Sequence, residues 1–435
     1  MKIIFMRVYL ETYGCVANKS DSEIILGLLK ENGFEIVNSP LESDINIINT
    51  CVVKTPTAKR MENRIKYLYS LGKPLIVAGC MTKPERERIE KIAKNASLIS
   101  PDAIEKIVDV VKKTLNGNKV VLLEGASKKP CLPFIPFNPI ISIVQISSGC
   151  LSACSFCETR LAKGVLRSYS VDQIIEKIER DLKNGFKEFW ITSQDNACYG
   201  LDIGTNIGEL LKSISKREGE FYVRVGMMNP TYLIKKPEIL ADVIEVLKDR
   251  KFFKFIHIPL QSGSDKVLKD MNRNYKVDEY IELVEVLRKE IPEIRIETDI
   301  IVGYPTETEE DFEKTVEVVR KLEFDSINIS KFSPRPKTPA ALLKELDVEV
   351  VKKRSKTLHE IVREILLRKN MKYVGETLNV FVDEFGTKEG TYIGRTLNYI
   401  PVVVYSKEKI FGKKVFVKIV EARSNFLIGE LLRDS

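Results

Sequence analysis

The chain has 435 residues, which is too long for one hydrophobic core and predicts two or three domains. Hydrophobic residues make up 44% and charged residues 30%; with no apolar run of about 18 residues and no signal-peptide pattern, we expect no membrane span and a cytoplasmic protein. The net charge is +8, and residues 344–435 carry 18 Lys and Arg against 13 Asp and Glu, which indicates a polyanionic partner such as nucleic acid, or else a solvated basic surface.

Residues 1–116 alternate short apolar runs with helical patterns, which predicts an α/β domain with a mostly parallel sheet. The sequence Ser20-Asp21-Ser22-Glu23 has the pattern of a capping box and predicts the start of a helix. Four runs are typical of strands: Met6–Thr12, Ile45–Cys51, Pro74–Cys80 and Leu98–Ser100.

Three cysteines of this domain, Cys15, Cys51 and Cys80, fall at or just beyond the ends of three of these strands. Ligands of open α/β sheets bind outside the carboxyl ends of the strands, so the three thiols could meet at one edge. Three separately buried cysteines are the alternative, which explains the residue type but not the shared location. The chain has eight cysteines, and in a reducing compartment they indicate metal or redox chemistry rather than disulfides.

Residues 117–136 have little pattern, contain Cys131 and three prolines, and predict a linker. Residues 137–370 then contain six strand-like runs with helical patterns between them, which predicts a partial (βα)6 barrel with an open side. Ser170 begins one of the helices with Gln173 as its capping-box partner, and Gly185 ends it. The six runs are ISIVQIS, FKEFWITS, FYVRVGM, KFIHIPLQ, IRIETDIIVG and DSINISKFS.

Residues 371–435 alternate like short strands separated by glycine-containing turns. The pattern resembles a small five-stranded barrel of the OB type, which frequently binds nucleic acid. The sequence as a whole therefore predicts a multidomain α/β protein that ends in a small β-barrel.

The stretch SGCLSACSFC, directly after the first strand of the predicted barrel, places Cys150, Cys154 and Cys157 close together. A zinc site needs a fourth ligand, and neither His257 nor His359 is near in sequence. Thiolates suit an iron–sulfur cluster, and three of them on a four-iron cluster leave one iron open for a substrate or cofactor. Zinc and redox thiols remain the alternatives at this point.

The C-x3-C-x2-C spacing of these three cysteines resembles that of the radical S-adenosylmethionine (SAM) superfamily. The resemblance implies a [4Fe-4S] cluster whose open iron is chelated by the amino and carboxylate groups of SAM. It also implies that one electron from the cluster splits SAM into methionine and a 5′-deoxyadenosyl radical. The protein's part is to position these groups and to exclude water.

The rest of the chain resembles the methylthiotransferases of this superfamily. YGCVANKSDSEI, INTCVVKT and VAGCM are similar to the family's N-terminal domain, which implies a second [4Fe-4S] cluster on Cys15, Cys51 and Cys80. The C-terminal barrel is similar to the TRAM domain, an RNA-binding module. CETRLAKGVLRSYS, SQDNACYG and FSPRPKTPA resemble the archaeal and eukaryotic threonylcarbamoyladenosine tRNA methylthiotransferases.

This resemblance implies transfer of a methylthio group to C2 of N6-threonylcarbamoyladenosine, just 3′ of the anticodon, with SAM as both methyl donor and radical source. It implies three partners: the tRNA anticodon stem-loop, an electron donor and a possible external sulfur donor. The bases of a single-stranded loop can be splayed out and read one at a time. The alternatives are a sister enzyme that acts on isopentenyladenosine in tRNA or on a ribosomal-protein aspartate, and a non-catalytic iron–sulfur RNA-binding protein.

Further candidate residues rest on weaker signals. Arg335 lies in a proline-rich loop and would bind a phosphate or carboxylate, or fasten the loop. Cys198, both histidines and Cys131 have no assigned role, and we expect Cys198 and the histidines to be structural. For SAM binding, with ordinary packing as the alternative, the candidates are Gln194, Asp195, Arg224, Gln261, Asp299 and Gly303, and for RNA they are Arg335, Lys352, Lys353 and Arg354.

Overall fold

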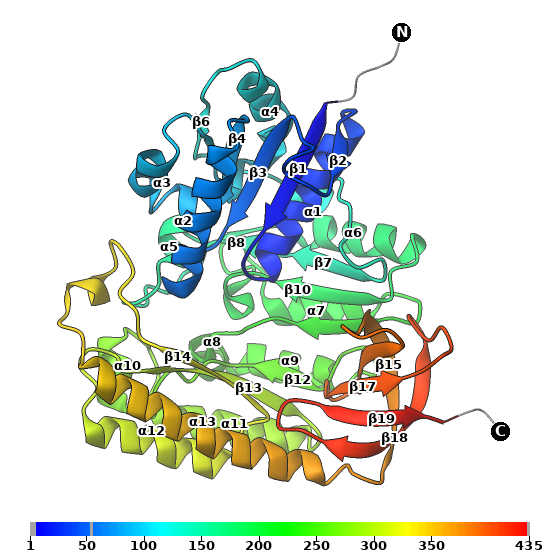
Figure 1. Cartoon of the computed structure of the whole chain (residues 1–435). Helices are drawn as coiled ribbons and strands as arrows, with labels where there is room; N and C mark the ends of the chain where they lie inside the picture. Colours follow the sequence, from blue (N-terminus) through cyan, green and yellow to red (C-terminus); the bar gives the residue numbers. More distant parts are fainter. Residues whose placement is uncertain (1–5, 53–54, 433–435) are drawn as a thin grey trace.

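The computed structural model describes residues 6–52 and 55–432, and it divides into an N-terminal sheet domain, a central barrel and a C-terminal barrel (Figure 1). The reading of the N-terminus as free of a signal peptide rests partly on residues 1–5, which lie outside the described residues. In the described part of the chain, no helix combines the length and the apolar character that crossing a membrane requires.

The N-terminal domain is a six-stranded, wholly parallel sheet in the order β2-β1-β3-β4-β5-β6, as predicted from the alternating pattern. Helices α1 and α4 cover one face with one apolar cluster, and α2 and α3 cover the other face with a second. The strands are β1 (Arg7–Thr12), β2 (Glu35–Val37), β3 (Ile45–Thr50), β4 (Leu75–Gly79), β5 (Ser97–Ile99) and β6 (Val121–Leu122); the helices are α1 (Val16–Glu31), α2 (Thr55–Ser70), α3 (Arg86–Ile92) and α4 (Ile107–Leu115).

The predicted start of the first helix is wrong by one turn. Helix α1 begins at Val16 with Cys15 as its N-cap, and the capping-box residues Ser20 and Glu23 lie inside the helix. Both are buried, because the helix turns this polar face toward the central barrel, where the backbone N–H of Phe137 donates to Glu23 at 2.9 Å. A polar interdomain face therefore has the same sequence pattern as a helix cap.

The segment 117–136 is more than a connection. Its strand β6 pairs with β5, so the parallel sheet continues past residue 116. The 3-10 turn η3 (Lys129–Cys131) then buries Lys129 between the domains and leaves Cys131 exposed.

The central barrel has the six predicted strands, in two parallel sheets, β11-β10-β7 and β12-β13-β14, joined by a bridge between Val223 and Phe252. The predicted capping box of Ser170 and Gln173 is confirmed at the start of α6. Strands are β7 (Ile141–Gln145), β10 (Glu188–Thr192), β11 (Tyr222–Val225), β12 (Phe255–His257), β13 (Arg295–Val302) and β14 (Ser326–Lys331), with a short pair β8 (Ser147–Ser148) and β9 (Arg167–Ser168); helices are α5 (Thr159–Lys163), α6 (Val171–Lys183), α7 (Ile207–Ser215), α8 (Pro230–Lys235), α9 (Pro237–Leu247), α10 (Asp265–Asp270), α11 (Val277–Glu290), α12 (Glu309–Leu322) and α13 (Val348–Met371).

The C-terminal domain is a closed five-stranded barrel, as predicted, and it covers the end of the central barrel at which the strands begin (Figure 1). The backbone N–H of Lys254 donates to Leu397 at 2.8 Å, and the ring of Tyr399 packs on that of Phe255. The opposite end of the central barrel, where the strands end, is therefore left to the cysteine loop. The C-terminal strands are β15 (Thr377–Phe385), β16 (Thr391–Arg395), β17 (Pro401–Tyr405), β18 (Lys414–Ala422) and β19 (Leu427–Leu431).

Candidate active site

Cys150, Cys154 and Cys157, the loop triad, lie in the connection between β8 and α5 at the strand-end side of the central barrel. Gly149 precedes them with a φ of 79°, and a Cβ there would lie 2.1 Å from the carbonyl oxygen of Val165. Only glycine fits this close approach of two backbones. The turn therefore sets the direction in which the cysteine loop leaves the barrel.

The loop triad is fastened to the far side of the barrel through Ser155. The Ser155 N–H donates to Met271 O at 3.1 Å, and its hydroxyl lies 2.8 Å from the hydroxyl of Tyr304. Asn272 also donates to the carbonyl of Ala153 at 2.7 Å. The middle of the loop is thus held by residues that follow β12 and β13, across the open end of the barrel.

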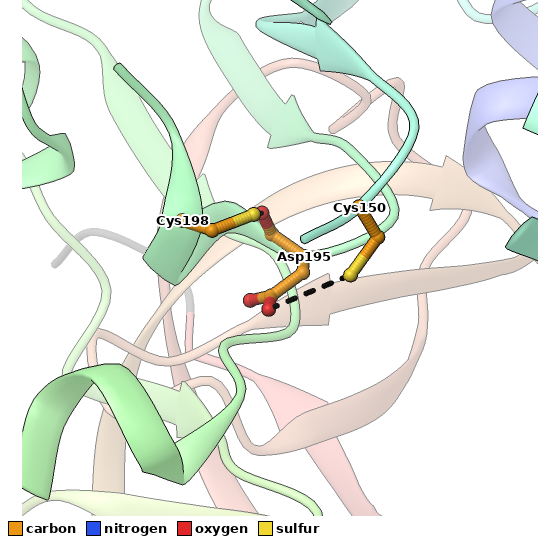
Figure 2. Close-up of side chains that lie close together, drawn as sticks. All are labelled: Cys150, Asp195 and Cys198. Atoms are coloured by element: carbon orange, nitrogen blue, oxygen red, sulfur yellow. Dashed lines mark hydrogen bonds between the residues drawn. The ribbon is translucent and has the colours of Figure 1, made fainter. Parts of the chain in front are cut away.

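Cys150 meets two further polar groups, which Figure 2 shows converging with it. The Cys150 thiol lies 3.9 Å from a carboxylate oxygen of Asp195, and the Cys198 thiol donates to the Asp195 carbonyl at 3.2 Å. The backbone N–H groups of Asn229 and Ala197 fix the Asp195 carboxylate at 2.9 and 3.0 Å. A hydrogen bond from Cys198 lowers the pKa of Cys150, and burial raises the pKa of Asp195 to about 6.

Arg273 is a charged neighbour of the loop triad that no sequence motif indicates. Its guanidinium donates to Cys154 Sγ at 3.4 Å and to the carbonyl of Pro259 at 3.3 Å. Burial acts to lower the pKa of Arg273, but the neighbouring Tyr275 and Cys154 raise it overall, so the group stays charged. Arg273 thus places a permanent positive charge beside Cys154 Sγ.

Cys15, Cys51 and Cys80, the strand-end triad, follow β1, β3 and β4, which are neighbours in the sheet. The loops that carry them lie at the same edge. A Cβ on Gly14, which has a φ of 114°, would lie 2.8 Å from Cys51 Cβ, so glycine lets the turn before Cys15 approach Cys51.

One buried side chain, Asn18 of α1, ties the three loops of the strand-end triad together. Its amide donates to the carbonyls of Tyr13 and Thr50 at 3.0 and 2.8 Å, and it accepts from the Cys80 thiol at 3.4 Å. Burial raises the pKa of Cys80 to about 12, and the nearby thiols of Cys15 and Cys51 act in the same direction. The three thiols are therefore close enough to interact electrostatically.

Among the described residues, neither triad has its sulfurs as close together as a single tetrahedral ion requires. In a tetrahedral zinc site, with Zn–S bonds of about 2.3 Å, two sulfurs are about 3.8 Å apart. Neither triad brings all its sulfurs within 4.8 Å of one another. Within the described ranges, that limit is met by two other groups, Cys150–Asp195–Cys198 and His257–Glu297–Asp299.

Arg335 is buried between the segments that carry the two triads. Its guanidinium donates to Glu158, directly after Cys157, at 2.8 Å, and to the carbonyl of Val52, directly after Cys51. The residue is 5% exposed, and burial raises the pKa of Glu158 to about 7. Of the two predicted roles of Arg335, these contacts favour fastening the loop over binding RNA.

A second buried contact joins the triads through Asp21 of α1. Lys163 at the end of α5 donates to Asp21 at 3.1 Å, and Gln145 at the end of β7 donates to it at 2.8 Å. Lys129 donates to the same carboxylate. The N-terminal domain and the central barrel are thus locked together beside both cysteine sites, and the sequence patterns pointed to none of these four polar side chains.

Among the SAM-binding candidates, Gln194 and Asp195 lie beside the loop triad, where Gln194 accepts from the Gly149 N–H at 2.7 Å. Gln261 has a φ of 72° and a buried side-chain oxygen that lacks a hydrogen-bond partner among the described residues. Asp299 lies in the barrel, 3.1 Å from His257, and accepts from Asn328 at 2.9 Å. These residues follow or line neighbouring strands around the open end.

The other two SAM-binding candidates pack against neighbouring side chains. Arg224 is surrounded by the rings of Trp190, Phe255 and Tyr399, at the end of the barrel that the C-terminal domain covers. At Gly303, with a φ of 79°, a Cβ would lie 2.6 Å from the side chain of Val351, so this position serves a turn packed on α13. Their positions favour the alternative of ordinary packing for both.

The three RNA candidates on α13 differ in exposure. Arg354 is 5% exposed and forms ion pairs with Glu307 at 2.9 Å and Glu309 at 2.7 Å, which favours a structural role over contact with RNA. Lys352 and Lys353 are exposed and remain available to a phosphate backbone. Consecutive basic residues on a helix lie on different faces, so only some of them are exposed.

Comparison with known proteins supports a division into three modules. Residues 7–100 match the family described as Uncharacterized protein family UPF0004. Residues 144–319 match the radical SAM superfamily, and residues 371–432 match the TRAM domain. The first match contains the strand-end triad, and the second contains the loop triad.

Similar curated proteins span the whole chain. A protein of Pyrococcus horikoshii named a probable threonylcarbamoyladenosine tRNA methylthiotransferase is 40% identical over 98% of this chain and 100% of its own length. One of Archaeoglobus fulgidus with the same name is 41% identical over 98% and 99%. The threonylcarbamoyladenosine tRNA methylthiotransferase of Drosophila melanogaster is 36% identical over 98% of this chain and 78% of its own.

Solved structures support the fold of the chain. The radical SAM methyltransferase TsrM of Kitasatospora setae superposes with a TM-score of 0.56 at 14% identity, covering 78% of this chain and 74% of its own. The cobalamin-dependent radical enzyme OxsB gives 0.51 at 14% identity over 82% and 56%. At this identity the likeness concerns the fold alone.

Proposed function

Because the chain belongs to the threonylcarbamoyladenosine tRNA methylthiotransferase family, we propose that it places a methylthio group on C2 of N6-threonylcarbamoyladenosine next to the anticodon of tRNA. The observation that carries this proposal is the placement of two cysteine triads on facing domains, locked together by Asp21 and Arg335. One triad serves radical formation and the other serves sulfur transfer, and both must reach the same adenine.

The loop triad is assigned to a [4Fe-4S] cluster that binds SAM. Three thiolates from one loop leave one iron without a protein ligand, and Arg273 supplies a fixed cation beside Cys154. Asp195, held by backbone N–H groups beside Cys150, and Gln194, which holds the Gly149 backbone, keep the loop in position. Gln261 and Asp299 follow around the barrel end as further candidates for contact with SAM.

The strand-end triad is assigned to a second [4Fe-4S] cluster. When bound, the two clusters and SAM would supply an electron, a hydrogen-abstracting radical, a methyl group and the site at which sulfur is presented. The chain holds Cys15, Cys51 and Cys80 at one sheet edge, and Asn18 fixes their loops. This places the strand-end triad on the side of its domain that contacts the central barrel.

The C-terminal barrel and the exposed lysines Lys352 and Lys353 are assigned to tRNA, and the protein is assigned to the cytoplasm with its substrate. Phosphate contacts by these basic groups would release counterions, so tRNA binding should weaken as salt rises. An electron donor is required by the proposed reaction, and an external persulfide is a possible sulfur source alongside cluster sulfide.

The test is anaerobic reaction of reconstituted protein with SAM, a reductant and tRNA, followed by mass spectrometry of the nucleosides. One tRNA carries threonylcarbamoyladenosine, and a matched tRNA carries isopentenyladenosine. We expect a methylthiolated product from the first only. Product from the second tRNA alone would replace the proposal with the sister activity on isopentenyladenosine. Formation of deoxyadenosine without any methylthiolated nucleoside would mean that the enzyme catalyses a different radical reaction.

A further inference from the structure

A group of buried charges beside the strand-end triad holds more positive than negative charge. Asp21 is the single carboxylate that accepts from both Lys129 and Lys163, and all three side chains are 1% exposed. Burial lowers the pKa of Lys129 to about 8, which still leaves its ammonium group protonated near pH 7. A buried charge without a counter-charge costs several kcal/mol, so the second ammonium requires another anionic partner.

The structure places that unmatched charge next to cysteines. Burial acts to lower the pKa of Lys163, but Asp21, Cys80 and Cys15 favour its charged form and raise the pKa overall. Asp102 also favours the charged form of Lys129, but its carboxylate is itself paired with Lys83 and Arg167. The two lysines therefore share Asp21, and Lys163 is the one whose helix packs against the turn that begins at Cys80.

Lys163 belongs to the central barrel, but its side chain contacts the N-terminal domain. Helix α5, which directly follows the loop triad, packs against the turn η1 (Cys80–Thr82). Ala162 is fully buried in the same apolar cluster as Cys80 and Met81. This packing fixes the backbone next to Lys163, so the ammonium cannot move away from the triad without undoing the domain contact.

We propose that Lys163 is a positioning residue for the group bound by the strand-end triad, and that its ammonium neutralises the negative charge of a cluster held by three thiolates. The inference rests on the proposed function, which assigns a cluster to this triad. The anionic cluster supplies the counter-charge that Asp21 alone does not. A cation beside an iron–sulfur cluster favours its reduced, more negative state, so Lys163 raises the reduction potential of this cluster.

The experiment isolates one cluster by using the full chain with Cys150→Ala, Cys154→Ala and Cys157→Ala. The reconstituted protein is titrated with reductant and followed by electron paramagnetic resonance. In this background Lys163→Met should lower the equilibrium constant for one-electron reduction at least tenfold, a shift of about 59 mV to more negative potential. Lys163→Arg should restore most of the shift because it keeps the charge.

Lys129→Met is the matched control, since Lys129 is equally buried and pairs with the same carboxylate. We expect it to shift the potential by less than half as much as Lys163→Met. An unchanged potential in Lys163→Met, or an equal shift in Lys129→Met, would overturn the proposal. A thermal melt of each variant reports whether the domain contact survives.

A second variant covers the case in which Lys163→Met does not fold. Asp21→Asn keeps both lysines and removes the nearby negative charge, so it should shift the potential to more positive values. A zero or negative shift in Asp21→Asn would overturn the proposal as well. If the parent protein without the loop triad binds no cluster, the assignment of a second cluster fails, and that result is seen before any charged residue is changed.

Discussion

The loop triad and the strand-end triad present three thiols each, but the chain assembles them in different ways. Cys150, Cys154 and Cys157 lie in one connection between β8 and α5, and short hydrogen bonds fasten that connection across the barrel end. The strand-end thiols come from three strands of a parallel sheet and meet only when the whole sheet has formed. The first site therefore depends on one segment and its anchors, and the second depends on a domain.

The two triads also differ in where their neighbouring positive charge comes from. Arg273 comes from the barrel that also carries the loop triad, whereas Lys163 reaches the strand-end triad from another domain. A local site can thus be complete in the central barrel alone, but the strand-end site is completed by docking of the domains. Mutations that loosen the domain contact should affect the second site first.

The largest expected effect comes from removing a loop cysteine. Cys154→Ala should abolish SAM cleavage and methylthio transfer together, because both need the open iron of that cluster. Iron content should fall by about half, since the strand-end triad is untouched. Deoxyadenosine and nucleoside products are measured on one anaerobic preparation, and deoxyadenosine formation at the wild-type rate would contradict the assignment.

The complementary variant, Cys15→Ala, Cys51→Ala and Cys80→Ala together, should separate the two activities. It should make no methylthiolated tRNA but still cleave SAM, because the loop triad and its anchors remain. Methylthiolated product from this variant would show that these cysteines do not present the sulfur. Loss of SAM cleavage in a folded variant would instead mean that the two sites depend on each other, and the contrast between them would disappear.

Sequence predicted those parts of each site that follow from local pattern. The spacing of the loop cysteines is visible in ten residues, and the strand-end cysteines could be grouped because each lies at or just beyond the end of an apolar run. The parallel sheet, the six barrel strands and the small C-terminal barrel follow from periodicity in the same way. Strands β2 and β6, of three and two residues, were not predicted.

The parts that sequence did not predict are contacts between side chains that are distant in the chain. Asn18, Lys163 and Arg273 carry no local signal, since their partners are distant in the chain. The pattern of Ser20 and Glu23 was misleading, because a buried polar face of a helix has the same sequence pattern as a capping box. Such contacts require knowledge of which faces meet, and that information is absent from any short window of sequence.

A weaker perturbation of the strand-end site is Asn18→Ala. The change leaves the carbonyls of Tyr13 and Thr50 without this donor, at a cost of about 1–3 kcal/mol for each buried acceptor that finds no other. We expect partial loss of iron from the strand-end site and lower methylthio transfer, with SAM cleavage unchanged. Asn32→Ala, at the exposed end of the same helix, is the control and should change neither. Equal losses of iron and SAM cleavage in Asn18→Ala would indicate general unfolding.

The smallest effect on either triad is expected from the far end of the barrel. Glu188 of β10 and Asp383 of β15 are fully buried where the C-terminal barrel covers the central one. Burial raises the pKa of Glu188 from 4.5 to about 8 and that of Asp383 from 3.8 to about 6. A raised carboxyl pKa stabilises the folded protein fully at pH values below the unfolded pKa, and that stability is lost as pH rises toward the folded pKa.

Glu188→Gln removes the ionisation but keeps an amide of similar size, so it should make the protein more stable than the wild type at pH 8 and nearly equal at pH 5. The difference in melting temperature between variant and wild type should therefore grow as pH rises, with a free-energy gain of at most a few kcal/mol at pH 8. Iron content and SAM cleavage, compared at one pH, should match the wild type, because both triads lie at the other end of the molecule. A melting difference that shrinks with rising pH would contradict the assigned direction of the pKa shift. Unequal loss of iron from the two triads would show that the barrel end covered by the C-terminal domain is coupled to one of them. The stability of that triad would then depend on residues far from its own loops.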